Sequence, residues 1–264
     1  MEQVTFTKDD LIRKLRDIKS MGWIANARPG NAGGVGNTLE NLLGIKENNL
    51  PIPNQAEWEL KAQRIGTSSL ITLFHMEPSP QALRFVTQVG LLKYGWEHAE
   101  AGKKYPSNEM SFRQTINASK QSDRGFIVVI NKEDRKIQIS FDANSVHSNH
   151  RIWLESVEKR VGLGELNPQP YWGFDDLFHK AGTKLLNTFY VQAEVKKENG
   201  IEYFYYSHIQ KLTEFSLNGF LDAFDAGYLY VDFDARSGHN HGTKFRLRQD
   251  NRPMLYKNIE IIEE

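Results

Sequence analysis

Two apolar segments, 188–197 and 201–208, flank the tripeptide Glu198-Asn199-Gly200. Asparagine followed by glycine accepts the positive φ angles of a tight hairpin turn, so this arrangement predicts a pair of antiparallel strands. A second hairpin is predicted where a short polar turn separates the apolar segments 125–130 and 136–142. The second half of the chain is therefore expected to contain much antiparallel sheet.

Other elements are predicted from the spacing of apolar residues and from the residues that begin or end helices. Helices are predicted at 7–20, 37–43, 174–186 and 214–225, and further strands at 57–62, 68–75, 228–235 and 245–248. Long loops are predicted at 94–125, where the sequence is polar and poorly patterned, and at 236–244. Helices combined with antiparallel strands predict an α/β (α+β) fold.

Composition limits the kinds of site that the chain can form. Its 264 residues are enough for one large domain or two lobes. The sequence contains no cysteine, so any metal must be held by oxygen or imidazole ligands. No apolar run approaches the roughly 20 residues of a membrane span, and we expect a cytoplasmic protein without membrane contact. The formal net charge of zero leaves a nucleic-acid partner open, because an acidic metal site can offset a basic surface elsewhere.

The triplet Glu59-Leu60-Lys61 lies on the strand predicted at 57–62. Alternate residues of a strand project from the same face, so Glu59 and Lys61 are expected to share one surface. Such a pair suits phosphodiester hydrolysis, in which a carboxylate holds Mg²⁺ and a lysine orients water or stabilises charge on the phosphate. Glu40, on the preceding helix, could bind metal or position a water. The alternative is a solvated surface pair, because Glu-x-Lys occurs by chance in most proteins.

The segment His239–Arg246, with the sequence HNHGTKFR, is rich in hydrogen-bond donors. Arginine can bond to two acceptors of guanine, and histidine and asparagine can read other base edges, so the segment could enter a DNA groove. Two alternatives are a surface loop with incidental histidines and a His-x-His metal site.

The longer context of both motifs resembles a known family. The run GGVGNTLENLLGIKENNLPIPNQAEWELK at 33–61 is similar to the catalytic core of the MvaI/BcnI restriction endonucleases, which are relatives of the mismatch-repair nicking enzyme MutH. The resemblance continues through SSLITLFH, YWGFDDLFHKAGTKLL and GHNHGTKFRL, in the same order along most of residues 9–250.

The resemblance implies an active site of Glu40, Asn54, Glu59 and Lys61, with Mg²⁺ held by Asn54 and Glu59. The family has an aspartate where this chain has Asn54, and an amide attracts Mg²⁺ less than a carboxylate does. Three interpretations are open. Asn54 is a natural, weaker ligand, or an engineered substitution, or its role is taken by the carboxylate of Glu57.

The resemblance also implies the residues that read DNA, namely His75, His239, Asn240, His241 and Arg246. The family recognises short C/G-rich sites of the CC-N-GG kind. Relatives carry an aspartate at the position of Asn240, which is suited to accept from cytosine N4, whereas asparagine can also donate to adenine. The outer bases of the target are therefore left open.

Taken together, the resemblance implies a restriction-endonuclease-like core with a mixed sheet, in which two lobes surround a DNA-binding cleft. Residues 1–125 are expected to form the catalytic lobe and 126–264 the DNA-recognition lobe. The implied function is type II restriction of double-stranded DNA with Mg²⁺, by a monomer that nicks each strand in turn. A cognate DNA methyltransferase is expected in the same cell. The alternatives are a MutH-like repair nickase and a catalytically silent DNA-binding protein.

Overall fold

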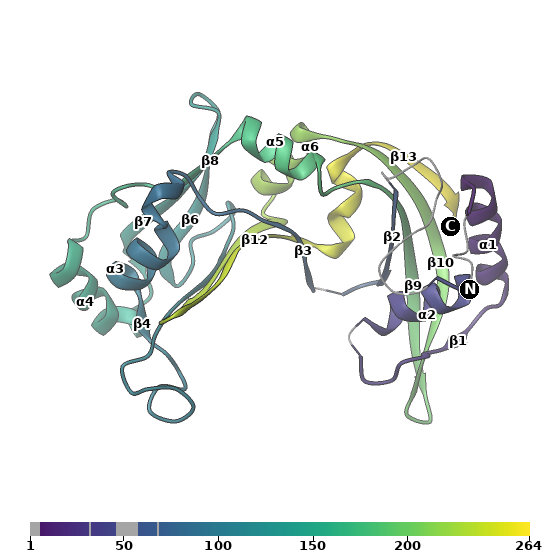
Figure 1. Ribbon diagram of the computed structural model, residues 1–264, viewed down its shortest axis with the longest axis horizontal. Helices are drawn as coiled ribbons and strands as arrows, with labels where there is room; N and C mark the ends of the chain where they lie inside the picture. Colours follow the sequence, from purple (N-terminus) through teal and green to yellow (C-terminus); the bar gives the residue numbers. More distant parts are fainter. Residues whose placement is uncertain (1–5, 32, 46–57, 68) are drawn as a thin grey trace. The chain divides into compact units, whose positions relative to one another are not determined.

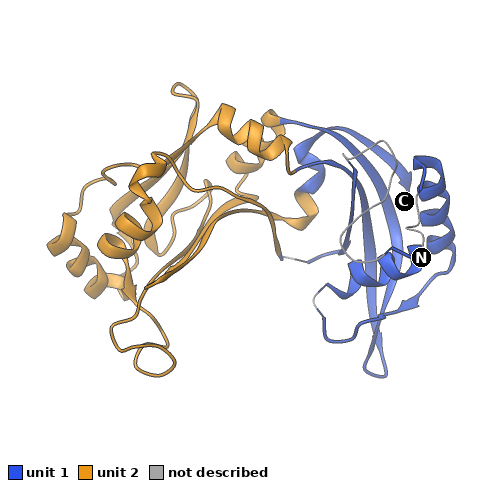
Figure 2. Ribbon diagram, in the orientation of Figure 1, with its two compact units in different colours: residues 1–69, 185–216, 252–264 blue, residues 70–184, 217–251 orange. Residues whose placement is uncertain are grey.

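The computed structural model describes residues 6–31, 33–45, 58–67 and 69–264. The chain forms two compact units, shown in Figure 2. Unit 1 consists of Met1–Ser69, Leu185–Ser216 and Arg252–Glu264, and unit 2 of Leu70–Lys184 and Leu217–Asn251. The boundary expected near residue 125 does not separate these units. Residues 185–216 join unit 1 because their hairpin pairs with a strand near the start of the chain.

Unit 1 is built on a mixed sheet of five strands (Figure 1). The long hairpin of β9 (Asn187–Glu198) and β10 (Ile201–Phe215) forms its centre. On one side β2 (Trp58–Arg64) pairs with β9 in parallel. On the other side, β1 (Ile24–Ala25) and β13 (Tyr256–Glu263) pair with β10 antiparallel. The mixed sheet that was expected is therefore present.

Helices α1 (Lys8–Ser20) and α2 (Gly34–Leu43) supply apolar side chains to the core of unit 1. Helix α1 begins where Thr7 accepts a hydrogen bond from the backbone N of Asp10 at 3.1 Å, and α2 ends at Gly44, whose φ of 70° favours glycine. The core contains alternate residues of the strands, among them Trp58, Phe189, Val191 and Phe204. Burying each such side chain contributes about 1.5–3 kcal/mol. The residues between them in sequence project from the opposite face.

Unit 2 contains an antiparallel five-stranded sheet in the order β3-β12-β11-β5-β4. The strands are β3 (Leu70–His75), β12 (His239–Arg248), β11 (Leu229–Arg236), β5 (Met110–Ile116) and β4 (Trp96–Glu97). A second sheet has three strands, β6 (Arg124–Asn131), β7 (Lys136–Val146) and β8 (Tyr171–Gly173). The main helices are α4 (Arg151–Val161), α5 (Phe174–Gly182) and α6 (Leu217–Asp225).

Shorter helical segments complete the fold. They are η1 (Gln81–Leu83), the π-helix η2 (Phe85–Leu91), α3 (Leu92–Tyr94), η3 (Ser148–His150) and η4 (Gln249–Leu255).

Aromatic side chains form the core beneath the five-stranded sheet. Phe74 stacks on Phe245 with ring centroids 4.8 Å apart, Phe112 lies 5.5 Å from Phe233, and Trp172 meets Phe245 edge-on at 5.3 Å. Such pairs are worth about 0.5–1.5 kcal/mol beyond their burial. Because these residues take one face of the sheet, the polar residues that alternate with them lie together on the other face.

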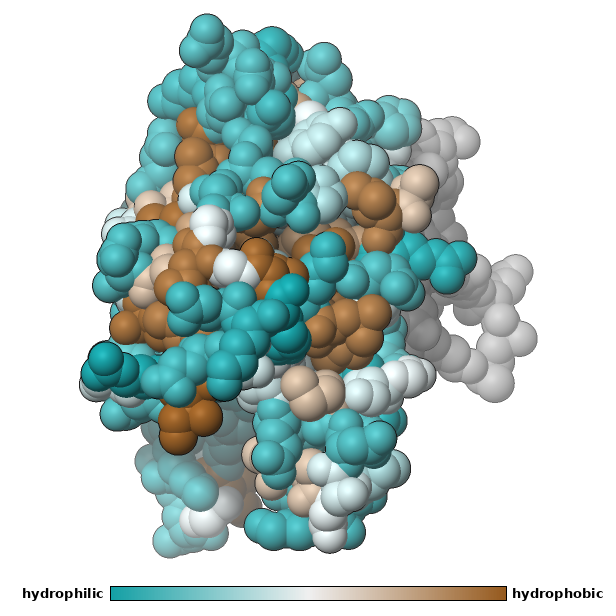
Figure 3. Space-filling model, turned by 90° about the vertical axis from the view of Figure 1, so that its left-hand side faces the viewer, coloured by the Kyte–Doolittle hydropathy of each residue, from teal (hydrophilic) through white to brown (hydrophobic). Residues whose placement is uncertain are grey.

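At the end of unit 2 that carries α4, hydrophobic side chains are visible among hydrophilic ones at the surface (Figure 3). Ile152 on α4 is 84% exposed and Leu92 is 60% exposed. None of the described helices is long and apolar enough to span a membrane.

Both predicted hairpins are confirmed, with Asn199 and Gly200 at φ angles of 51° and 80° in the turn of the first. The long loops expected at 94–125 are wrong, because β5 lies there as an interior strand of the sheet between β11 and β4. The loop expected at 236–244 is also wrong, because β12 already begins at His239. Helix α4 was not predicted. Polar segments become strands here because neighbouring strands satisfy their backbone groups.

Candidate active site and nucleic-acid interface

Glu59 and Lys61 lie on the same face of β2, opposite the apolar core of unit 1. Lys61 Nζ lies 2.5 Å from Glu59 Oε1, and the two side chains are 43% and 32% exposed. The parallel pairing with β9 places Glu59 opposite Thr188 and Lys61 opposite Tyr190. The expected shared surface of a carboxylate and an ammonium is therefore present and partly exposed to solvent.

A buried polar cluster borders Glu59 on the neighbouring strand. Thr188 Oγ1 lies 3.0 Å from the hydroxyl of Tyr256, which donates to the carbonyl oxygen of Leu186 at 2.9 Å. Burial raises the pKa of Tyr256 above its usual value, and the positive charge of Arg252 opposes that effect. Arg252 is only 5% exposed, and its Nη1 has no hydrogen-bond partner among the described residues. Sequence reasoning missed this cluster, because nothing local links Arg252 and Tyr256 to residue 59.

The other residues expected in the active site are less fully described. Glu40 is partly buried on α2, the helix that packs against β2. Asn54 and Glu57 lie outside the described residues. The structure therefore brings Glu59 and Lys61 together and places Glu40 on a neighbouring element.

The described residues fit a hard divalent cation only in part. The Glu59 carboxylate is an oxygen ligand of the kind that such cations take, and it is accessible. Among the described residues, no group of three or more His, Asp or Glu side chains could hold a metal ion. Magnesium sites in enzymes that act on phosphates commonly use one or two carboxylates, with water and substrate oxygens as the other ligands. Glu59 suits that kind of site.

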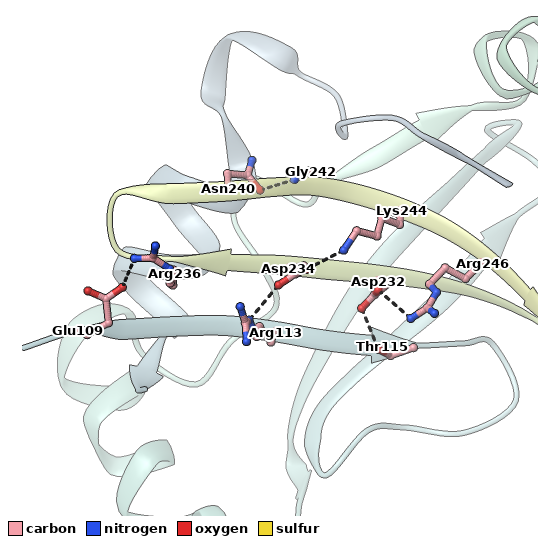
Figure 4. Close-up of polar contacts among 10 residues, drawn as sticks. All are labelled: Glu109, Arg113, Thr115, Asp232, Asp234, Arg236, Asn240, Gly242, Lys244 and Arg246. Carbon is pink, nitrogen blue, oxygen red and sulfur yellow. Dashed lines mark hydrogen bonds and ion pairs between the residues drawn. The ribbon is translucent and has the colours of Figure 1, made fainter. Parts of the chain in front are cut away.

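The expected DNA-reading residues of unit 2 lie at the start of β12. His239, Asn240 and His241 are all exposed, and the two imidazole rings meet edge-on with centroids 4.2 Å apart. The side chain of Asn240 accepts a hydrogen bond from the backbone N of Gly242 at 2.9 Å (Figure 4). That bond leaves the Asn240 NH₂ group available as a donor.

His75, at the end of β3, lies beside this segment. A side chain added at Gly242 would lie 3.3 Å from His75 Cδ2, and the φ of 83° at this position also favours glycine. Glu77 holds the segment in place, because Thr243 donates to its carboxylate through the backbone N at 2.9 Å and through Oγ1 at 3.1 Å. Two segments far apart in the sequence, 75–77 and 239–243, therefore lie side by side.

Arg246 is held by other residues of unit 2. Its Nη1 lies 3.2 Å from Asp232 Oδ2, and its Nη2 donates to the carbonyl oxygen of Leu70 at 3.0 Å. Asp232 also accepts from Thr115 Oγ1 at 2.8 Å. The guanidinium is thus oriented by the sheet, with part of its side chain still exposed.

A second group of charges lies on the same sheet face (Figure 4). Asp234 lies between Lys244 Nζ, at 2.6 Å, and Arg113 Nε, at 2.9 Å. Partial burial acts to raise the pKa of Asp234, but the hydrogen bond and charge of Lys244, with the charges of Arg113 and His241, hold that pKa below its usual range. Sequence reasoning missed Arg113, Asp232 and Asp234. The alternating Asp-Phe-Asp at 232–234, on a predicted strand, was the signal that could have found the two aspartates.

Comparison with known proteins identifies the family in which these residues occur. The sequence model of the MvaI/BcnI restriction endonuclease family matches residues 12–256. The chain belongs to this family. Members of the MvaI/BcnI family are restriction endonucleases, which are nucleases that act on DNA.

Two solved structures are similar to this MvaI/BcnI family member in fold. A complex of restriction endonuclease MvaI with its cognate DNA substrate is 21% identical, with a TM-score of 0.64 over 97% of this chain and 99% of that chain. MvaI in the absence of DNA is also 21% identical, with a TM-score of 0.60 over 99% of this chain and 100% of that chain. The expected restriction-endonuclease-like fold is therefore confirmed. Among curated protein sequences no match was found.

Proposed function

We propose that this chain is a type II restriction endonuclease that hydrolyses double-stranded DNA at a short C/G-rich site of the CC-N-GG kind. The observation that carries the proposal is the pairing of Glu59 with Lys61 on one accessible face of β2, in a chain of the MvaI/BcnI family. We assign catalysis to unit 1 and most of the base contacts to unit 2. Catalysis and base recognition are thus still assigned to different parts of the chain, but the parts are the two compact units of the structure.

Glu59 would hold a divalent cation, for which we propose Mg²⁺, together with Asn54. A bound Mg²⁺ polarises the phosphate and lowers the pKa of a water. Lys61 would exchange its contact with Glu59 for one with the reacting phosphate or the attacking water, and would stabilise negative charge as it develops. Glu40 would position water from α2. We propose that hydrolysis leaves a 5′-phosphate.

For recognition, we assign His239, Asn240, His241 and Arg246 to base edges in the major groove, and His75 to the central base pair. The exposure of the first three and the fixed orientation of Arg246 support these roles. The bonds to Asp232 and to the carbonyl oxygen of Leu70 leave one N–H on each of Nη1 and Nη2 of Arg246, which is the number that a two-bond contact with guanine needs.

We further propose that the enzyme acts as a monomer that nicks one strand and then rebinds to cut the other. It would work in the cytoplasm, where a cognate methyltransferase protects the host DNA. There are two alternatives, the second of which follows from Asn54, which has no negative charge. A MutH-like nickase would need a partner for activity, and a silent DNA-binding protein would not cut at all.

Digestion of a sequenced plasmid with Mg²⁺, followed by mapping of the ends, tests the proposal. A type II enzyme gives double-strand breaks at one short sequence without any added partner. Nicks that appear only with a partner protein indicate the repair nickase. Sequence-specific binding without any scission, in Mg²⁺ or Mn²⁺, indicates the silent protein.

A further inference from the structure

Unit 2 contains a pocket of about 640 Å³ next to the proposed base-reading residues. Its wall includes His75 and Asn240, and it continues past Glu77 to Arg84 and Lys180. Arg84 stands between η1 and the π-helix η2, and Lys180 lies in the last turn of α5. Two separate segments of the unit therefore place two cationic side chains in one pocket.

The charged side chains that line this pocket carry an excess of positive charge. The Glu77 carboxylate is its acidic member, and both Glu77 oxygens accept hydrogen bonds from Thr243. Within the described part of the chain, neither the Arg84 guanidinium nor the Lys180 ammonium makes an ion pair or a side-chain hydrogen bond. Two partnerless cations in a concave, partly shielded site attract an anion more strongly than they would on an open surface.

The backbone of Arg84 adopts a conformation that favours glycine. Its φ of 44° and ψ of 54° lie in the left-handed region, which a bulky side chain seldom adopts. The conformation is held because the carbonyl oxygen of Arg84 accepts from the backbone N of Thr87 at 3.0 Å and of Gln88 at 2.9 Å. Glycine would relieve the strain, so an arginine here indicates that the side chain itself is used.

We propose that this pocket binds a phosphate group of the DNA backbone, next to the bases read by His75 and Asn240. The inference rests on the proposed function, since it takes duplex DNA as the ligand. Arginine can grip phosphate oxygens with two parallel hydrogen bonds, and lysine adds a compact charge. A phosphate contact here would fix the position of unit 2 along the duplex but would not read sequence.

The test measures DNA binding of the full chain as a function of salt concentration, without divalent cations so that no cleavage occurs. The variants are Arg84→Gly, Lys180→Ala and both together, with cognate and non-cognate duplexes. The association constant K falls as salt concentration rises, and each lost phosphate contact should make the slope of log K against log salt concentration shallower by about 0.9. Binding to the cognate and the non-cognate duplex should weaken equally. Lys159→Ala is the matched control, because Lys159 is an exposed cation on α4 outside the pocket.

Arg84→Gly gives a second, independent result. Removing the strain should leave the midpoint of thermal unfolding equal to or above that of the parent protein, while the salt slope falls. A salt slope that stays at the parent value in the double variant would overturn the phosphate site. So would a loss confined to the cognate duplex, since that identifies a base contact. If the parent protein binds no duplex at all, the proposed function fails instead, and the two failures are thus distinguishable.

Discussion

Arg246 on β12 forms an ion pair with Asp232 on β11, with Nη1 and Oδ2 3.2 Å apart. The two residues are diagonal neighbours, because Arg246 pairs in register with Tyr230 and Asp232 with Lys244. Asp232 is the less exposed partner and is itself fixed by Thr115. The carboxylate thus orients the guanidinium in the free protein. In the proposed role of Arg246, this orientation would lower the entropy lost when the arginine contacts a base.

We therefore expect Arg246→Ala to reduce the preference for cognate over non-cognate duplex by roughly 1–3 kcal/mol, because a two-bond contact to guanine is lost. Asp232→Asn should reduce the same preference by a smaller amount, since Arg246 remains but is less well held. Competition binding with duplexes that differ at single base pairs measures both effects. If binding to all duplexes weakens equally, Arg246 contacts phosphate and not a base.

Lys61→Ala should lower the rate of DNA cleavage by about 10²–10³-fold, because a positioned charge near the reacting phosphate is removed. DNA binding should be nearly unchanged. Single-turnover cleavage and anisotropy titration measure the two quantities separately. Lys196→Ala is the control, since Lys196 belongs to the same unit and is also paired with a glutamate, Glu198, at 2.9 Å. Normal cutting by the Lys61 variant would remove it from the active site.

Asn54→Asp should lower the Mg²⁺ concentration needed for half-maximal cleavage, because a carboxylate attracts the cation more strongly than an amide does. A titration of cleavage rate against Mg²⁺ checks this directly. If Glu57 already supplies the missing charge, Glu57→Gln will abolish cleavage and Asn54→Asp will have little effect. An unchanged titration in both variants would contradict both metal-ligand assignments.

Glu202 makes the stability of unit 1 depend on pH. Arg64 donates two hydrogen bonds of 3.0 Å to the Glu202 carboxylate, and these lower the pKa of Glu202. Burial acts to raise that pKa, but the positive charge of Arg64 and a 2.8 Å hydrogen bond from Asn26 lower it further. A lowered pKa in the folded state stabilises the protein above the unfolded-state pKa of about 4.3. That contribution is lost as the pH falls through the folded-state pKa.

Glu202→Gln should therefore reduce the free energy of unfolding by about 1.5 kcal/mol at neutral pH, with the difference from the parent protein shrinking below about pH 4. Urea unfolding of both proteins at a series of pH values measures this difference in the free energy of unfolding. Glu198→Gln is the control, because Glu198 is an exposed partner of Lys196. A pH-independent difference would mean that the ionised form of Glu202 is not what matters.

Local sequence was enough to predict the parts of the fold that depend on neighbouring residues. Asn199 and Gly200 specify the turn of a hairpin, Thr7 begins α1 and Gly44 ends α2, since each acts through backbone angles or a bond within four residues. The shared face of Glu59 and Lys61 follows in the same way from the period of a strand.

Contacts between distant segments account for the rest. β5 and the start of β12 are polar segments that become strands because β11 takes their backbone groups in the sheet. Strand pairing also brings Asp232 to Arg246 and, in the other sheet, Thr188 to the side of Glu59. Glu77, just after the end of β3, reaches Thr243 in the same way. The sequence alone thus predicts which residues carry the chemistry, through local spacing and family resemblance. Their partners depend on the tertiary structure, because strand pairing brings together residues that the sequence keeps far apart.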